Sequence, residues 1–160
     1  MRVLAVGSRA LLVEVDSLGA VLALHAALLA ARPAGVIDVV AAARTVLVSC
    51  TDADAAATAR ALVDTLDLSA APQRDETLVE VRVLYDGADL EAVANLTGLS
   101  VEAVIAAHTG QTWTAAFGGF APGFTYCVGE HHALDVPRRA TPRTAVPAGA
   151  VGLAGEFSAV

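Results

Sequence analysis

Three arginines lie close together in a short segment near the end of the chain, and their chemistry is the first indication of a site. Arg138, Arg139 and Arg143 occur with no acidic residue between Asp135 and Glu156, in a chain of formal net charge −7. The planar guanidinium group binds carboxylate or phosphate through parallel hydrogen bonds. The cluster is therefore a candidate anion-binding site. The alternative is a solvated loop whose arginines pair with surplus carboxylates elsewhere, and charge alone does not separate the two.

The arginines belong to a segment, 117–155, that is rich in glycine, proline and aromatic residues. Glycine permits positive φ, and proline fixes the path of the chain and removes a backbone donor. A rigid loop of this kind adds little to an apolar core, so we expect it to shape a site. The residues expected to shape the loop or to form an interface are Phe120, Pro122, Gly123, Phe124, Pro142, Pro147 and Gly149.

Histidines are the next candidates for chemistry. His108 ends a predicted helix, where it could act as a ligand or a general base, or could simply meet the helix dipole and the last carbonyl groups. His131 and His132 are adjacent in a predicted surface loop, and His25 falls on an apolar helix as a satisfied core or boundary residue. The sequence offers no nucleophile elbow, no paired carboxylates near the arginines and no metal-ligand spacing. It therefore holds no complete catalytic set by itself.

The composition bounds the fold and excludes several classes of function. The chain of 160 residues can bury one good core or two small ones, and the excess in its 56% hydrophobic content is mostly alanine. The longest apolar run, 18–31, is too short to span a bilayer and is interrupted by His25. The N-terminus lacks the order of features of a signal peptide. We therefore expect a cytoplasmic protein with no membrane partner and with Cys50 and Cys127 as buried thiols.

All ten basic residues are arginine, so the chain has no lysine for a phosphate-binding loop or a Schiff base. If the protein takes part in ATP-dependent chemistry, it does so without such a loop. The segment 90–108 imitates a helix-turn-helix, but its second helix offers Glu102 and no arginine. DNA recognition needs basic phosphate contacts. We expect a packed helical hairpin and no nucleic-acid partner.

The first half of the chain predicts a ββαββα unit, which makes a small α/β sandwich. Residues 2–6 and 11–15 form a strand pair, Ser17 caps a helix to about Ala31, and a second strand pair and helix follow. The later strands are 36–41 and 44–49, and the later helix runs to about Leu66 from a cap at Asp52 or Asp54. The polar stretch 69–76 is the predicted linker, so we expect domains at 1–75 and 76–160.

The second domain is predicted to begin with an amphipathic strand, because residues 78–85 alternate apolar and charged side chains. Two short helices follow, at about 89–96 and 101–108, with Ser100 as the cap of the second. From Gln111 the pattern changes to short strands and turn-rich loops. The fold class is therefore α+β, with a small barrel expected in the second domain.

Two ordered motifs in this half carry a family resemblance. The first is GFAPGFTY, 119–126, and the second is PRRATPRTAVPAG, 137–149. Together they resemble the family of the 5-oxoprolinase B subunit, which includes the histidine kinase inhibitor KipI and allophanate hydrolase subunit 1. The chain departs from the family at Cys127, where an apolar residue is usual, and at Glu156, where a glutamine is usual.

The resemblance implies a cyclophilin-like β-barrel, incomplete at the C-terminus because family members continue further. It also implies a non-autonomous component of a 5-oxoprolinase complex, which uses ATP to convert 5-oxoproline into L-glutamate. This chain alone would bind no cofactor, and its partners would be the A and C subunits of the complex. The substrate carboxylate is then the expected ligand of Arg138, Arg139 or Arg143, and His108, on the family's His-Thr motif, and Tyr126 are candidates for orienting a polar group.

Two other functions within the family stay open. A KipI-like inhibitor of a sensor histidine kinase would use a protein-facing apolar surface around 117–124. A component of allophanate hydrolase or urea-dependent carboxylation machinery would need a biotin-carrying partner. A cyclophilin-like barrel does not imply prolyl isomerase activity, because fold does not fix function.

Overall fold

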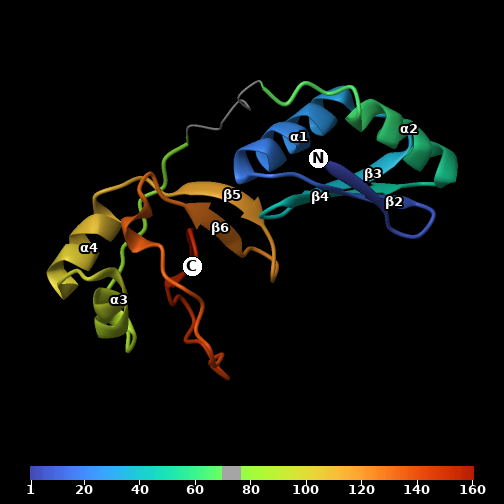
Figure 1. Ribbon diagram of the computed structural model, residues 1–160. Helices are drawn as coiled ribbons and strands as arrows, with labels where there is room; N and C mark the ends of the chain where they lie inside the picture. Colours follow the sequence, from blue (N-terminus) through green and yellow to red (C-terminus); the bar gives the residue numbers. More distant parts are fainter. Residues whose placement is uncertain (70–76) are drawn as a thin grey trace. The chain divides into compact units, whose positions relative to one another are not determined.

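The computed structural model describes residues 1–69 and 77–160, which form two compact units, Met1–Thr77 and Leu78–Val160 (Figure 1). Each unit is built on one four-stranded sheet whose neighbouring strands pair in antiparallel fashion. The fold class is α+β, as predicted. Apart from Ser69, the predicted linker lies outside the described residues.

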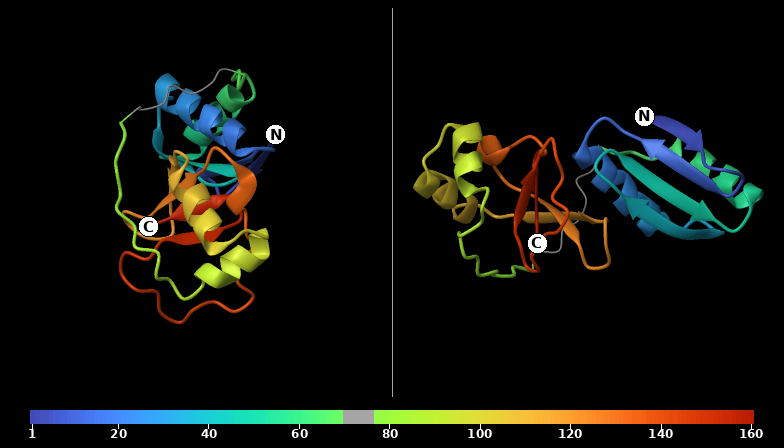
Figure 2. Two further views of the ribbon diagram at one scale, coloured as in Figure 1. Left: turned by 90° about the vertical axis from the view of Figure 1, so that its left-hand side faces the viewer. Right: turned by 90° about the horizontal axis from the view of Figure 1, so that it is seen from below.

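The first unit has the predicted ββαββα order. Its elements are β1 (Arg2–Ala5), β2 (Ala10–Glu14), α1 (Leu18–Ala31), β3 (Val36–Ala41), β4 (Thr45–Cys50) and α2 (Ala53–Val63). The sheet order is β1-β2-β4-β3, so the two hairpins meet through their second strands. Both helices cover the same face of this sheet (Figures 1 and 2). The unit is therefore a two-layer sandwich.

Period-two and helical patterns explain the core of this unit. In β4, Val46, Val48 and Cys50 are buried while the residues between them are only partly so. In α1, Leu24 and Leu28 lie one turn apart and are both fully buried. Burying a side chain of this size contributes about 1.5–3 kcal/mol. The core is thus aliphatic and lies between the sheet and its two helices.

Local capping signals set the helix boundaries. Ser17 Oγ accepts a hydrogen bond from the Ala20 amide at 3.2 Å, as predicted for the start of α1. Asp52 Oδ1 accepts one from the Ala55 amide at 2.8 Å, which identifies Asp52 rather than Asp54 as the cap of α2. The second helix ends at Val63, three residues before the predicted end. These caps satisfy amides that a helix leaves without internal partners.

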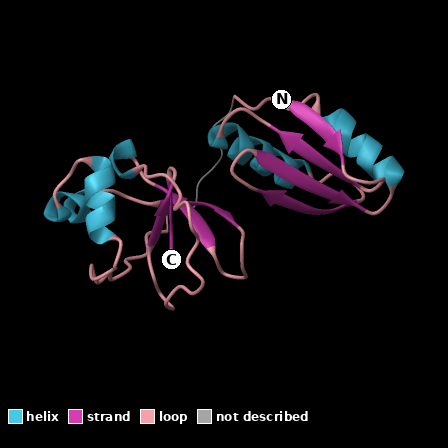
Figure 3. Cartoon of the chain, turned by 60° about the horizontal axis from the view of Figure 1, so that its bottom comes forward, coloured by secondary structure: helices cyan, strands magenta, loops and turns pink. Residues whose placement is uncertain are grey.

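The second unit contains two short helices, a 3₁₀ turn and a second sheet. Its elements are α3 (Leu90–Thr97), α4 (Val101–Thr109), β5 (Thr114–Gly118), β6 (Thr125–Val128), the 3₁₀ turn η1 (His132–Leu134), β7 (Gly152–Ala154) and β8 (Phe157–Ala159). The sheet order is β5-β6-β8-β7. Extended loops join these strands (Figure 3). The second unit is therefore richer in irregular backbone than the first.

The helices α3 and α4 pack together as a bent pair. Gly98 ends α3 in the left-handed conformation at φ 70°, and Ser100 Oγ caps α4 by accepting from the Ala103 amide. Ala94, Val104 and Leu134 form the buried cluster that joins the pair to η1. No single helix among the described residues is long and apolar enough to cross a membrane. The α3–α4 pair passes that test only when taken together, with an 89° bend at the junction.

Two expectations about the second unit are corrected. The predicted strand 78–85 is wrong: no described strand pairs with it, and Leu78 and Leu84 are each 81% exposed. Alternation supplies strand-forming side chains, but a strand also needs a neighbour for its backbone hydrogen bonds. The described residues also form no closed barrel, because β5 and β7 stay unpaired with each other at opposite edges of an open sheet.

Candidate functional site

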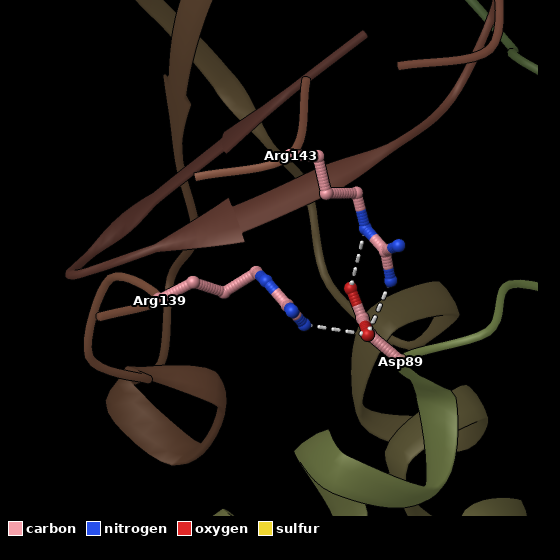
Figure 4. A network of polar contacts seen from close by, with 3 residues as sticks. All are labelled: Asp89, Arg139 and Arg143. Carbon is pink, nitrogen blue, oxygen red and sulfur yellow. Dashed lines mark hydrogen bonds and ion pairs between the residues drawn. The ribbon is translucent and has the colours of Figure 1, made fainter. Parts of the chain in front are cut away.

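Two of the three predicted arginines converge on one carboxylate, that of Asp89 (Figure 4). Arg143 approaches side-on: its Nε lies 3.2 Å from Oδ2 and its Nη2 lies 2.6 Å from Oδ1. Arg139 Nη1 donates to the same Oδ1 at 2.8 Å. The group joins the loop 137–149 to the residue that precedes α3. It has the paired geometry with which guanidinium groups recognise carboxylates.

The electrostatics of this group follow from the contacts. The hydrogen bond from Arg143, together with the positive charges of both arginines, lowers the pKa of Asp89 below its ordinary value. The same carboxylate raises the pKa of Arg143. Arg139, Arg143 and Asp89 keep side-chain exposures of 53%, 40% and 40%. Water and salt therefore reach the group, and an anion in solution can compete for it.

Arg138 behaves differently from its two neighbours. It is exposed and forms no hydrogen bond or ion pair with the described part of the chain. Arg139 and Arg143 thus fit the alternative interpretation of the sequence, in which the arginines pair with an acid elsewhere in the chain. Arg138 leaves a guanidinium group available next to them in sequence.

His108 lies inside a small aromatic group at the end of α4. Its Nδ1 is 2.7 Å from the hydroxyl of Tyr85, and its ring centroid is 5.0 Å from that of Trp113. The indole Nε1 of Trp113 donates to the carbonyl oxygen of His108 at 3.0 Å. Burial lowers the pKa of His108 and raises that of Tyr85, so both groups favour their neutral forms.

One nitrogen of His108 is left without a partner. Its Nε2 is buried and has no hydrogen bond to any described residue. A buried polar atom of this kind costs free energy unless water or another group pairs with it. The contact of Nδ1 with the hydroxyl of Tyr85 fixes the orientation of the ring, and Nε2 needs a water molecule or a movement that exposes it to gain a partner.

Tyr126 lies in an aromatic cluster on the second sheet. Its ring stacks on Phe117 at a centroid distance of 4.7 Å and meets Phe157 and Phe124 edge-on at 5.6 and 5.1 Å. Its hydroxyl makes no hydrogen bond to the residues described. Aromatic pairs at these distances contribute about 0.5–1.5 kcal/mol beyond simple burial. Tyr126 thus supports the sheet and retains a hydroxyl group free for a ligand.

The loop between β5 and β6 makes two tight turns in succession. The Ala121 amide donates to Gly119 at 2.7 Å, which closes a γ-turn around Phe120 at φ 64°. The Phe124 amide then donates to Ala121 at 3.0 Å, and Gly123 at φ 82° gives the turn its type II character. Phe120 is 89% exposed. A bulky residue in the left-handed region is strained, so this aromatic ring is held outward against a local cost.

The remaining histidines lie away from any cluster of ligands. His132 Nδ1 is 3.0 Å from Asp135 on the surface, and His25 Nε2 is 3.2 Å from the carbonyl oxygen of Val39. The expectation of a partnered boundary position for His25 is confirmed. Among residues 1–69 and 77–160 there is no group of three histidine, cysteine or acidic side chains that could hold a metal ion.

Comparison with known proteins places these features in a family. The chain matches the carboxyltransferase domain family, subdomain C and D, over residues 1–160. The chain belongs to this family. Three proteins similar to this chain are named as the B subunit of 5-oxoprolinase. This confirms the family resemblance that the two sequence motifs indicated.

The relatives match over part of their length. The 5-oxoprolinase B subunit of Bacillus subtilis (strain 168) is 43% identical over 81 residues, 49% of this chain and 34% of that protein. Its counterpart from Escherichia coli O157:H7 is 40% identical over 95 residues, 58% of this chain and 44% of that protein. The counterpart from Haemophilus influenzae (strain ATCC 51907 / DSM 11121 / KW20 / Rd) is 42% identical over 80 residues, which are 48% of this chain and 38% of that protein. The matched span is less than half of each relative.

A solved structure agrees with the fold of this carboxyltransferase-domain chain. The crystal structure of TTHA0988 matches with a TM-score of 0.74 in one crystal form and 0.72 in another, at 32% identity. The match covers 95% of this chain and about a third of the other, 31% in the form with TM-score 0.74 and 32% in the form with TM-score 0.72.

Two residues of the candidate site were missed in the sequence. Asp89 was expected only as the start of a helix, and its pairing with arginines 50 and 54 residues away leaves no local signal. Tyr85 was placed on a strand, and its contact with His108 joins residues 23 positions apart, so it also leaves no local signal. No hydrogen bond or ion pair in the described part of the chain links Asp89 or its arginines to His108 or Tyr126.

Proposed function

We propose that this chain is the B subunit of an ATP-dependent 5-oxoprolinase, which opens the ring of 5-oxoproline to give L-glutamate. The observation that carries the proposal is its 40–43% identity to three proteins named for that role. The chain works as a non-autonomous component and assembles with the A and C subunits. Since residues 1–160 include no lysine, any lysine that contacts the ATP phosphates comes from outside this segment.

The role of this chain is to hold the substrate by its carboxylate. The contact of Asp89 with Arg139 and Arg143 supports this role, because a carboxylate already fits between the two guanidinium groups. Arg138 adds a further positive charge without a competing acid in the described part of the chain. Guanidinium forks discriminate carboxylates by geometry as well as by charge. 5-Oxoproline offers one carboxylate, which satisfies this requirement.

Two further residues are assigned supporting roles in the same chain. The free hydroxyl of Tyr126 can orient a polar atom of a substrate or of a partner protein, and His108 can do so once a side-chain movement exposes its buried Nε2. Burial lowers the pKa of His108 and so favours the neutral ring, whose Nε2 can take part in one hydrogen bond. These are orienting roles, and the ring-opening chemistry depends on the complete assembly.

Reconstitution tests the proposal directly. The A and C subunits are combined with and without this chain, and glutamate is measured in the presence of ATP and 5-oxoproline. We expect glutamate formation to require both ATP and this chain. Equal activity without the chain rules out the assignment. A chain heated beyond unfolding and added in the same amount is the matched control for non-specific protein effects.

A KipI-like inhibitor is the second candidate, favoured by one observation. Phe120 is 89% exposed on a strained turn, as a residue that inserts into a partner protein would be. The test is autophosphorylation of a purified sensor histidine kinase with and without this chain. Dose-dependent inhibition that is lost on Phe120→Ser supports the second candidate. Unchanged phosphorylation, together with ATP-dependent glutamate formation in the reconstituted complex, excludes it.

A further inference from the structure

Asp89 occupies a helix-capping position without capping the helix. It directly precedes α3, where an aspartate normally accepts hydrogen bonds from the first free amides. In this protein its side chain makes no capping hydrogen bond, and its carboxylate points to Arg139 and Arg143 (Figure 4). The backbone of Asp89, at φ −100° and ψ 2°, lacks the extended conformation of a cap, so the carboxylate is paired with the two arginines and not with the amides of α3.

The contact with Asp89 uses the same donors that a carboxylate ligand would need. Arg143 engages both Nε and Nη2 with Asp89, and Arg139 engages Nη1. A ligand carboxylate can form the side-on pair, through Nε and Nη2 of Arg143, only where Asp89 has left these donors. Internal and external carboxylates thus compete for one fork, and the outcome depends on their relative free energies.

We propose that Asp89 is an internal carboxylate that occupies the Arg139–Arg143 fork until a small-molecule carboxylate displaces it. The inference rests on the proposed function for the identity of that ligand, 5-oxoproline. On displacement, the carboxylate of Asp89 is released to solvent as the arginines change partner. Arg138 attracts the ligand beforehand, because no acid among the described residues neutralises it.

The surroundings allow such an exchange. The loop 137–149 is irregular and exposed along its length, so the arginine side chains can move without disturbing a core. The ion pairs are 40–53% exposed, and exposed pairs hold only weakly against a competing anion. The internal contact is therefore strong enough to set the resting arrangement and weak enough to be replaced.

Asp89→Asn is the variant that separates this role from capping. Asparagine caps helices about as well as aspartate, so α3 keeps its potential cap while the fork loses its internal anion. Asp86→Asn is the matched control, because it removes the same charge three residues away. The hydrogen bonds of Arg139 and Arg143 go to Asp89, so this control leaves them in place. Both variants shift net charge equally.

Binding of 5-oxoproline to the purified chain is measured by the shifts of the arginine Nε–H signals in nitrogen-15 NMR. We expect Asp89→Asn to bind about five- to tenfold more tightly than the parent, because apparent affinity rises with the fraction of the fork that is open. Asp86→Asn binds as the parent does. The derivative of 5-oxoproline in which a carboxamide replaces the carboxylate should bind neither the parent chain nor either variant.

Other outcomes overturn the inference. If Asp89→Asn binds 5-oxoproline equally well, more weakly or undetectably, then Asp89 only shapes the loop. If Asp86→Asn tightens binding as much, the effect is net charge and not the fork. The reconstituted glutamate assay separates the two proposals. If the complex is active but Asp89→Asn binds 5-oxoproline as the parent does, the internal-carboxylate proposal alone is ruled out. If the complex is inactive but Asp89→Asn binds 5-oxoproline more tightly, the proposed activity alone is ruled out.

Discussion

The two units of this chain differ in how their residues are used. The first unit has an aliphatic core and contains none of the seven phenylalanine, tyrosine and tryptophan residues of the chain. All seven lie in the second unit, together with the arginine loop and the strained turn at Phe120. The first unit shows regular capping and alternating burial. The second carries irregular backbone, exposed charge and a buried unpaired nitrogen.

This difference indicates a division between scaffold and site. Unpaired polar atoms and strained residues reduce stability, and proteins keep them mainly where binding requires them. The helix caps and buried strand faces of the first unit satisfy local rules, and its Arg32, at φ 44°, ends α1 in the left-handed conformation. The second unit departs from local rules at Asp89, His108 and Phe120. Stability measurements on each unit can test the division, since Trp113 is the only tryptophan and reports the second unit.

The largest effect is expected in the core of the first unit. Leu24 is fully buried on α1, so Leu24→Ala leaves a cavity and lowers the free energy of unfolding by about 2–5 kcal/mol. Urea unfolding followed by far-ultraviolet circular dichroism measures this loss. Leu29→Ala, on the exposed side of the same helix, is the control. We expect the Trp113 fluorescence transition to stay in place, and an equal shift of that transition would contradict separate units.

A smaller effect of opposite sign is expected at the strained turn. Phe120→Gly relieves the positive φ and raises the free energy of unfolding of the second unit by up to about 1 kcal/mol. The urea transition of Trp113 fluorescence measures it. Phe124→Gly is the control, because Phe124 is partly buried against Tyr126 and its loss lowers stability. Destabilisation by Phe120→Gly would mean that the contact with Phe124 outweighs the strain.

The smallest effect concerns pH. Burial lowers the pKa of His108 in the folded chain, so the unfolded state binds a proton more readily. Stability of the second unit is therefore full above the ordinary histidine pKa and declines as pH falls through it toward the folded value. Urea transitions of Trp113 fluorescence on either side of that pKa show the decline. We expect His108→Gln to flatten the dependence of the unfolding free energy on pH, and His132→Gln, on the surface, to leave it unchanged. An equal pH dependence in the parent and both variants would contradict burial of His108 as the cause.

Local signals predicted the first unit better than the second. Ser17 and Asp52 cap helices through contacts three residues away, so the sequence itself contains both partners. The strand expected at 78–85 failed because its pairing depends on a neighbour elsewhere in the chain. The arginine loop lies between these cases. Its residue types indicated anion binding, but its partner Asp89 depends on the path of the chain between positions 50 residues apart.

The central claim is that Arg143 and its neighbours bind the carboxylate of 5-oxoproline, and the reconstituted complex tests it most directly. Arg143→Ala removes a charge-assisted pair of hydrogen bonds and should raise the KM for 5-oxoproline about ten- to a hundredfold. Arg143→Lys should rescue poorly, since a point charge cannot replace a paired fork. The Trp113 transition should not move in either variant. An unchanged KM in Arg143→Ala, or full rescue by lysine, would contradict the account.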